Sequence, residues 1–179
     1  MFRPLLAVVA ALALSAAPAA AEVVSRTADS FTLRYAVESR VAPETIGPSL
    51  VDLPEWWDSA HTYSGSADNL GLDLTPGGCW CERLADGTDF DHGRTVSVTA
   101  DSYVFHAPFG PMRGKTTRAE LTVTWPVANR GRSLTWTMVV EGPGIGAMAD
   151  AIDAVMGAGH RRWMTWLERD LVIVTASGA

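Results

Sequence analysis

Apolar and polar residues alternate in short stretches along most of the chain. In residues 31–37, for example, Phe31, Leu33 and Tyr35 alternate with Thr32 and Arg34. A period of two places successive side chains on opposite faces of a β-strand. The same pattern predicts seven strands, at residues 31–37, 70–74, 79–84, 95–100, 103–107, 120–125 and 134–140. Between them we expect turns at Pro76–Gly78 and Asn129–Gly131, and a loop over the polar run Asp89–Gly93.

The stretch 142–171 contains one long amphipathic helix. Gly142, Gly144 and Gly146 precede the helical pattern, and roughly 25 residues at 1.5 Å each give a length of about 37 Å. At 100° per residue one face is apolar and carries Met148, Ile152, Val155, Met156, Gly159, Trp163, Trp166 and Leu167. The opposite face carries Asp150, Asp153, Arg161 and Glu168, which we expect to be solvated. Because Gly157 and Gly159 are unfavourable inside a helix, the helix either bends there or leaves space beside it.

A single amphipathic helix cannot bury its own apolar face, so a broad apolar surface must cover it. The strands supply such a surface, and two short helical pieces over residues 41–53 and 54–58 follow the first strand. We therefore predict an α+β protein in which a seven-stranded antiparallel sheet curves around the long C-terminal helix.

The first 21 residues have the pattern of a signal peptide rather than of a folded element. Arg3 is followed by the apolar run 5–14, and small residues at Ala19 and Ala21 fit cleavage before Glu22. The alternative, an uncleaved membrane anchor, is disfavoured because the apolar run is shorter than the roughly 20 residues that span a bilayer. We expect a periplasmic or secreted protein with no stable membrane span after cleavage.

Composition narrows the choice of partners. Removing 21 of the 179 residues leaves 158, which suits a single domain over residues 22–179 and changes the formal charge from −6 to −7. An acidic domain whose single lysine is Lys115 is unsuited to nucleic acid or to an anionic membrane surface.

One stretch resembles a known group of proteins. The run 56–82 contains the pair Trp56–Trp57, the cluster His61, Tyr63, Ser64 and Gly65, a leucine-alternating strand, and the hairpin sequence Gly-Gly-Cys-Trp-Cys-Glu at residues 77–82. It resembles the SRPBCC superfamily of START-like, polyketide cyclase-like helix-grip proteins, and the order of elements along the whole mature chain is similar too. The resemblance implies a shared fold and a cavity between sheet and helix, not one reaction. Export does not fit one role found in the superfamily, the stimulation of an ATP-driven cytosolic chaperone.

Cys79 and Cys81 are the two cysteines of the chain. At positions i and i+2 of a regular strand their Cα atoms would lie about 6.6 Å apart with parallel side chains, which strains a disulfide. We therefore expect two free, buried thiols. The alternative is a soft-metal site with His61 as a third ligand, but two cysteines alone are a weak signal and we predict no metal.

Two polar residues stand out as candidates for chemistry. His61 is either a general acid or base at the mouth of the cavity or a residue that holds its own loop through hydrogen bonds. Tyr63 either donates a hydrogen bond to a ligand or caps the core. No nucleophile–histidine–acid order, phosphate-binding loop or paired-carboxylate motif is recognisable, and we expect no cofactor.

The function that these features favour is binding of a small hydrophobic or amphipathic molecule in the cavity, with no protein partner identified. The expected lining comprises Trp57, His61, Tyr63, Cys79, Cys81, Trp136, Met138, Met156, Gly159 and Trp163. The alternatives are a polyketide cyclase-like enzyme that uses His61 or Tyr63 for proton transfer, and a non-catalytic structural or interaction module.

Overall fold

A computed structural model describes residues 22–125 and 133–169. The expected signal peptide, the turn at Asn129–Gly131 and the last part of the predicted helix lie outside these residues. The described strands are β1 (Glu22–Arg26), β2 (Ser30–Glu38), β3 (Leu70–Leu72), β4 (Cys79–Arg83), β5 (Asp89–Val98), β6 (Ser102–His106), β7 (Arg118–Thr124) and β8 (Ser133–Glu141). The α-helices are α1 (Pro43–Ser49), α2 (Leu53–Trp56) and α3 (Ala149–Leu167). Short 3₁₀ helices are η1 (Ser59–His61), η2 (Ala67–Asn69), η3 (Gly110–Met112) and η4 (Ile145–Met148).

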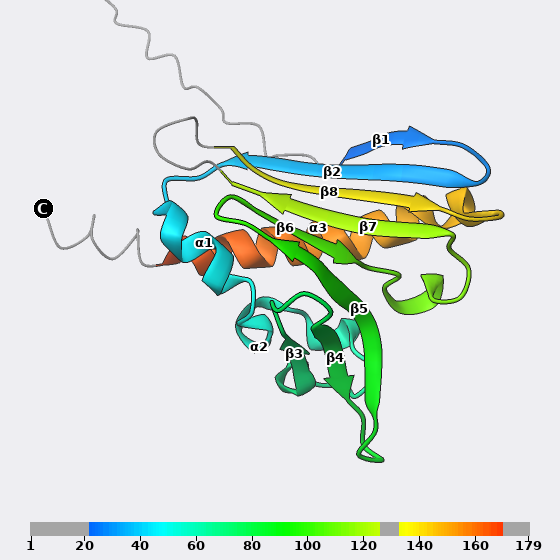
Figure 1. The fold of residues 1–179 in the computed structure, drawn as a ribbon. Coiled ribbons are helices and arrows are strands. Elements are labelled where there is room, and N and C mark those ends of the chain that lie inside the picture. The colour runs from blue at the N-terminus through cyan, green and yellow to red at the C-terminus, as the bar shows by residue number, and fades with distance from the viewer. Residues whose placement is uncertain (1–21, 126–132, 170–179) are drawn as a thin grey trace, which may run out of the picture.

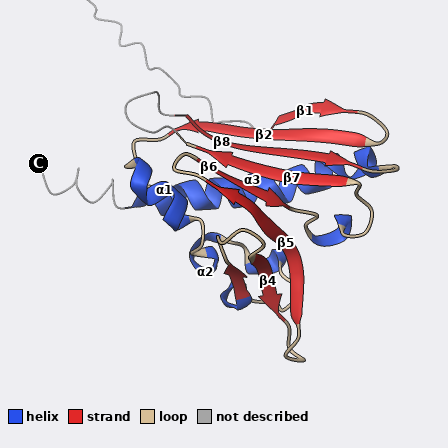
Figure 2. Cartoon of the chain, in the orientation of Figure 1, coloured by secondary structure: helices blue, strands red, loops and turns tan. Residues whose placement is uncertain are grey.

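The described strands form one antiparallel sheet in the order β1-β2-β8-β7-β6-β5-β4-β3. Helix α3 lies along one face of the sheet, and α1 and α2 close the space at its side (Figure 1). Colouring by secondary structure shows the same two layers, with the helices on one side of the curved sheet (Figure 2). The predicted α+β helix-grip architecture is confirmed.

The core lies between α3 and the central strands, as the alternation predicts. Phe31, Leu33 and Tyr35 of β2 are buried, and so are Trp136 and Met138 of β8. Transfer of each such side chain out of water stabilises the fold by about 1.5–3 kcal/mol. On α3 the buried residues are Ala149, Ile152, Met156, Gly157, Gly159, His160, Trp163, Met164 and Leu167.

The number of strands was wrong, because the described sheet also contains β1. This strand covers only residues 22–26, which are too few to show a clear alternation, and it pairs with β2 at the edge of the sheet. β5 also begins earlier than expected. The polar run Asp89–Gly93, predicted as a loop, forms the first half of β5 and pairs with β4.

The glycines of α3 do not break the helix. It runs without interruption through Gly157 and Gly159 and begins at Ala149, after the 3₁₀ turn η4. Gly142, Gly144 and Gly146 precede it, and α3 has 19 residues within the described part of the chain. None of the described helices is long and apolar enough to cross a membrane.

Candidate functional site

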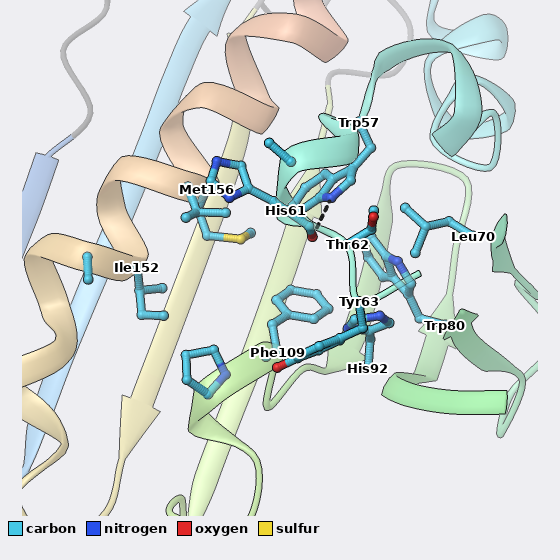
Figure 3. Close-up of a pocket in the computed structure, with 15 residues that line it drawn as sticks. Trp57, His61, Thr62, Tyr63, Leu70, Trp80, His92, Phe109, Ile152 and Met156 are labelled. Atoms are coloured by element: carbon cyan, nitrogen blue, oxygen red, sulfur yellow. Dashed lines mark hydrogen bonds between the residues drawn. The ribbon is translucent and has the colours of Figure 1, made fainter. Parts of the chain in front are cut away.

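A pocket of about 330 Å³ opens beside the N-terminal half of α3. Its walls come from α3, from the loop that follows α2, from strands β3 to β5 and from the segment around η3 (Figure 3). The lining is mainly apolar and comprises Trp57, Ala60, His61, Thr62, Tyr63, Leu70, Trp80, His92, Phe109, Gly110, Pro111, Ala151, Ile152, Val155 and Met156.

The pocket exists because β5 belongs to two parts of the sheet. Its first half pairs with β4, and its second half pairs with β6. The register shifts between Thr95 and Ser97, which is typical of a β-bulge and bends a strand. The hairpin of β3 and β4 therefore turns away from the strands that cover α3 (Figure 1). The space between this hairpin and the first half of α3 is the pocket.

The loop of residues 57–63 forms one wall, and internal hydrogen bonds fix its shape. The Trp57 Nε1–H donates to the carbonyl oxygen of His61 over 3.2 Å. The Asp58 carboxylate accepts from the Ala60 N–H at 3.0 Å and caps η1. The same carboxylate binds Arg162 of α3 at 2.7 Å. The hydrogen bond from Ala60 and the charge of Arg162 lower the pKa of Asp58.

A buried acid–histidine pair lies at the sheet side of the pocket. Glu82 of β4 is fully buried, and its Oε2 is 2.8 Å from Nε2 of His92 on β5. The other carboxylate oxygen, Oε1, accepts a hydrogen bond from the Ser64 N–H. His92 is itself buried, yet it lines the pocket.

The Glu82 carboxylate stays ionised in this setting. Burial alone would raise the pKa of Glu82, but hydrogen bonds from Ser64, from the Tyr63 N–H and from His92 outweigh it and lower the pKa. Since a carboxylate only accepts hydrogen bonds, Nε2 of His92 carries the hydrogen that they share. The other ring nitrogen of His92, Nδ1, makes no hydrogen bond within the described part of the chain.

Tyr63 covers this pair at the rim of the pocket. Its ring stacks on that of His92, with centroids 5.8 Å apart and an interplanar angle of 22°. It also contacts Phe90 at 4.6 Å between centroids. A Cβ atom placed on Gly110 would lie 3.7 Å from the Tyr63 hydroxyl, so this hydroxyl lies beside Gly110 at the edge of the opening. The residue is 56% exposed, and it does not cap the core.

The structure brings together some of the expected lining and not the rest. Trp57, His61, Tyr63 and Met156 line the pocket. Trp136, Met138 and Trp163 do not. They are fully buried in the core between sheet and helix, where the rings of Trp136 and Trp163 lie 5.3 Å apart. The space at that place is filled, and the pocket lies nearer the N-terminus of α3.

Gly159 is part of a close contact rather than of an open wall. A Cβ atom on this glycine would lie 2.8 Å from Cζ3 of Trp57. The glycines were expected either to bend the helix or to leave space beside it. Neither is the case: α3 is continuous at Gly159, and Trp57 occupies the space next to it.

His61 fixes its loop through its backbone rather than its ring. The imidazole is exposed and makes no hydrogen bond within the described residues, whereas the carbonyl accepts from Trp57. In Figure 3 it lies with Trp57 and Met156 at the helix side of the pocket, away from the pair formed by Tyr63 and His92.

The prediction of free thiols at Cys79 and Cys81 was wrong, because the two sulfurs form a disulfide. The pairing of β4 with β5 shifts register between Trp80 and Cys81, and the Cα atoms of the two cysteines lie 5.3 Å apart. A Cα separation of this size is ordinary for a disulfide. The longer separation and parallel side chains of a regular strand would strain the bond. Both cysteines are partly exposed and neither lines the pocket.

The disulfide also removes the basis for the alternative metal site. Among the described residues, the third possible metal ligand within 4.8 Å of both sulfurs is Asp91. His61, the ligand expected from the sequence, is not part of this group. Asp91 binds Arg94 at 2.6 Å, and bonded sulfurs are not thiolate ligands.

A second buried histidine lies behind the pocket and was not predicted. His160 of α3 stacks on Tyr35 at 5.6 Å and meets the edge of Trp136 at 5.3 Å. Its Nε2 has no hydrogen-bond partner, and burial lowers the pKa of the imidazole to about 4. The neighbouring Asp153, expected to be solvated, is half-buried and accepts a hydrogen bond from the Tyr35 hydroxyl at 2.8 Å. Burial and this bond raise the pKa of Tyr35.

Glu82 and His92 were also missed, for two different reasons. Glu82 lies two residues after Trp80 and so shares its strand face, which was a usable signal that this carboxylate points inward. His92 lies in the polar run that was predicted as a loop, and no local pattern reveals that β4 pairs with this run.

Comparison with known proteins supports the fold and goes no further. No family model and no curated protein sequence matches the chain. Among solved structures, an uncharacterised protein from Rhizobium leguminosarum is similar with a TM-score of 0.56 at 19% identity, over 81% of this chain and 99% of that one. A protein from Nitrosomonas europaea is similar with a TM-score of 0.54 at 15% identity, over 79% and 96%.

The two-domain ARO/CYC protein StfQ of the steffimycin biosynthetic pathway is also similar. Its TM-score is 0.52 at 12% identity, over 82% of this chain and 53% of StfQ, so the chain spans about half of that protein. At such identities the likeness concerns the fold alone. This chain thus shares its fold with the ARO/CYC structures StfQ and BexL and with an uncharacterised protein.

Proposed function

We propose that this protein binds a small apolar or amphipathic molecule in the pocket beside α3. The observation that carries the proposal is the pocket itself, with mainly apolar walls and a few polar groups at one side. Ligand sites commonly combine an apolar lining with a small number of placed polar groups, and a volume of about 300 Å³ is at the small end of their range. The ligand is therefore compact, with one or two rings and a polar group at one end.

The open pocket favours a binding protein over a purely structural module. A module without a ligand would gain stability from filling this space, as Trp136 and Trp163 fill the core further along the helix. Here small residues of α3, Ala151 and Val155, face the pocket instead. The fold likeness to StfQ is compatible with a cyclase-like enzyme, but it carries no reaction to this chain.

The test is a titration with the fluorescent dye anilinonaphthalene sulfonate. Ala151→Phe places a large ring in the pocket from an exposed helix position, so the fold is unaffected. We expect this variant to lose at least about tenfold in dye affinity, or about 1.4 kcal/mol. Ala154→Phe is the matched control, because Ala154 is exposed on the same helix and does not line the pocket. Equal affinities of wild type and Ala151→Phe would place the dye elsewhere and reject the proposal.

We further propose that the protein acts after export, as a chain that begins at Glu22. The signal-like N-terminus motivates this, and the disulfide between Cys79 and Cys81 supports it, since disulfides persist in oxidising compartments. N-terminal sequencing of protein from the periplasm or the medium should read Glu-Val-Val-Ser. Recovery of the protein in the cytosol with Met1 still attached would contradict it.

A further inference from the structure

We propose that the Glu82–His92 pair makes the pocket a proton-transfer site, which removes and returns a proton on a carbon next to the carbonyl group of a bound apolar ketone. This proposal rests on the proposed binding function, because the ketone must occupy the same pocket. It assigns the chemistry to His92, whereas the sequence suggested His61 or Tyr63.

The two side chains are arranged as a base and the acid that orients it. A histidine that is buried, lines a pocket and holds a buried carboxylate on one ring nitrogen has the geometry of a general base with its orienting acid. His92 meets each condition, with Nε2 at 2.8 Å from Glu82. Because Nε2 carries the shared hydrogen, the free lone pair lies on Nδ1, and this nitrogen is left for a ligand.

Glu82 is held in place from two sides. Its two oxygens bind different elements, the loop at Ser64 and the strand at His92. An isolated buried carboxylate is costly, and these bonds keep it charged. A fixed negative charge beside Nε2 stabilises the imidazolium that forms when Nδ1 takes a proton.

A hydrogen-bond donor, the Tyr63 hydroxyl, also lies at the rim of the pocket. The Tyr63 hydroxyl lies beside Gly110 at the rim, and the ring of Tyr63 stacks on His92. A ketone whose apolar rings lie against Ile152 and Met156 would direct its polar end to this side of the pocket (Figure 3). The phenol can then donate to the oxygen on which negative charge develops.

The proposed step balances without an oxidant or a metal ion. Nδ1 of His92 takes the proton, and the electrons of the broken C–H bond form the C=C bond of an enolate. The carbonyl π electrons move to the oxygen, which accepts the hydrogen bond from Tyr63. Return of a proton from the imidazolium to the same carbon breaks the C=C bond of the enolate and restores the ketone.

His61 is a weaker candidate on the same criteria. Its ring is exposed and has no hydrogen-bond partner within the described residues, so nothing fixes its orientation or its tautomer. A base held in place contributes typically about 10²–10⁴-fold, and a freely rotating one loses much of that effect.

The test measures deuterium incorporation into α-tetralone, an apolar bicyclic ketone, in heavy water by proton NMR. Displacement of anilinonaphthalene sulfonate by the ketone measures binding separately. We expect wild type to accelerate exchange. In His92→Gln the exchange rate at saturating ketone should be at least about tenfold lower, while the ketone still binds. His106→Gln is the matched control, because His106 is an exposed histidine on the neighbouring strand β6 and should exchange like wild type.

Two further variants separate chemistry from folding. Tyr63→Phe keeps the stacked ring at an exposed position, so a loss of exchange rate with normal stability supports the role of the hydroxyl. Glu82 acts through His92 as a positioning residue, and Glu82→Gln should lower the rate at saturation while the affinity for the ketone is retained. If Glu82→Gln does not fold, the exchange rates of His92→Gln and Tyr63→Phe still decide whether the pocket transfers a proton.

Three outcomes would overturn the proposal. If α-tetralone binds and wild type exchanges no faster than His92→Gln, the protein is a binder without this chemistry. If exchange depends on His61 and not on His92, the site is misassigned. If α-tetralone fails to displace the dye from a wild-type pocket that binds the dye, ketones are not ligands and this inference fails while the binding proposal stands.

Discussion

The indole of Trp57 lies directly against Gly159, so closely that a Cβ atom there would be 2.8 Å from Cζ3 of the ring. Glycine inside a helix costs about 1 kcal/mol relative to alanine, and this contact explains its presence. The same indole forms part of the pocket wall, so a substitution at Gly159 acts on the helix packing and on the pocket together.

We therefore expect Gly159→Leu to lower the free energy of unfolding by about 1–3 kcal/mol, as overpacking does, and to weaken dye binding because Trp57 is displaced. Urea unfolding and dye titration measure the two effects. Ala154→Leu, at an exposed position of α3, is the control and should change neither. Unchanged stability and affinity in Gly159→Leu would show that Trp57 does not rest on the helix.

Acid should destabilise the protein through His160. Its pKa is about 4 in the folded chain and about 6.5 when unfolded, so between these values the unfolded chain binds a proton that the folded chain does not. This contribution to stability is present above about pH 6.5 and is lost as the pH falls towards 4, with about 2 kcal/mol lost at about pH 5.

Urea unfolding above about pH 6.5 and again at about pH 5 measures this loss of stability. The loss should be smaller in His160→Phe, which has no imidazole to protonate. His106→Phe, at an exposed histidine, should behave like wild type. A loss of stability between these pH values that is identical in His160→Phe and wild type would assign it to other groups.

Thiol titration of the denatured, unreduced protein should find no free thiol. The double variant Cys79→Ser/Cys81→Ser should lose only about 1–2 kcal/mol of stability, because a bridge over so few residues removes little entropy from the unfolded chain. Two titratable thiols in protein isolated from an oxidising compartment would contradict the disulfide.

The loop of residues 57–63, which forms one wall of the pocket, should be stabilised by the hydrogen bond from the Ala60 N–H to Asp58 more than by the ion pair of Asp58 with Arg162. Asp58→Ala removes the acceptor for the Ala60 N–H, which typically costs about 1 kcal/mol, and should weaken dye binding by up to about tenfold. Asp58→Asn keeps an oxygen acceptor for the Ala60 N–H and removes the negative charge that pairs with Arg162. Because exposed ion pairs contribute about 0–1 kcal/mol, it should bind nearly as wild type does. A larger loss in Asp58→Asn than in Asp58→Ala would reverse this assignment.

The sequence predicted the layers well because they follow from local periodicity. Alternation in β2 and β8 and the apolar face of α3 are each visible within one stretch of chain, and each is confirmed. Residues that matter through pairing between distant stretches were not predictable in this way. His92 faces the pocket only because β5 pairs with β4, and Cys79 meets Cys81 only because β4 is irregular.

The pocket was expected one turn or more too far along the helix for a related reason. Trp136, Met138 and Trp163 have the right spacing to face each other, and they do so, but they are large enough to fill the space between them. Periodicity shows which side chains point inward. It does not show whether their combined volume leaves room for a ligand.

The bend in β5 sets the width of the pocket. At Gly93 the strand passes so close to β6 that a Cβ atom would lie 2.5 Å from the carbonyl oxygen of His106. The β3–β4 hairpin pairs with the first half of β5, whereas the strands on the other side of β5 cover α3. The hairpin joins the strands that cover α3 only through β5, so the shape of this one strand determines how far the hairpin lies from the helix. We therefore expect substitutions in β5 to change the width of the pocket without changing the tryptophan core.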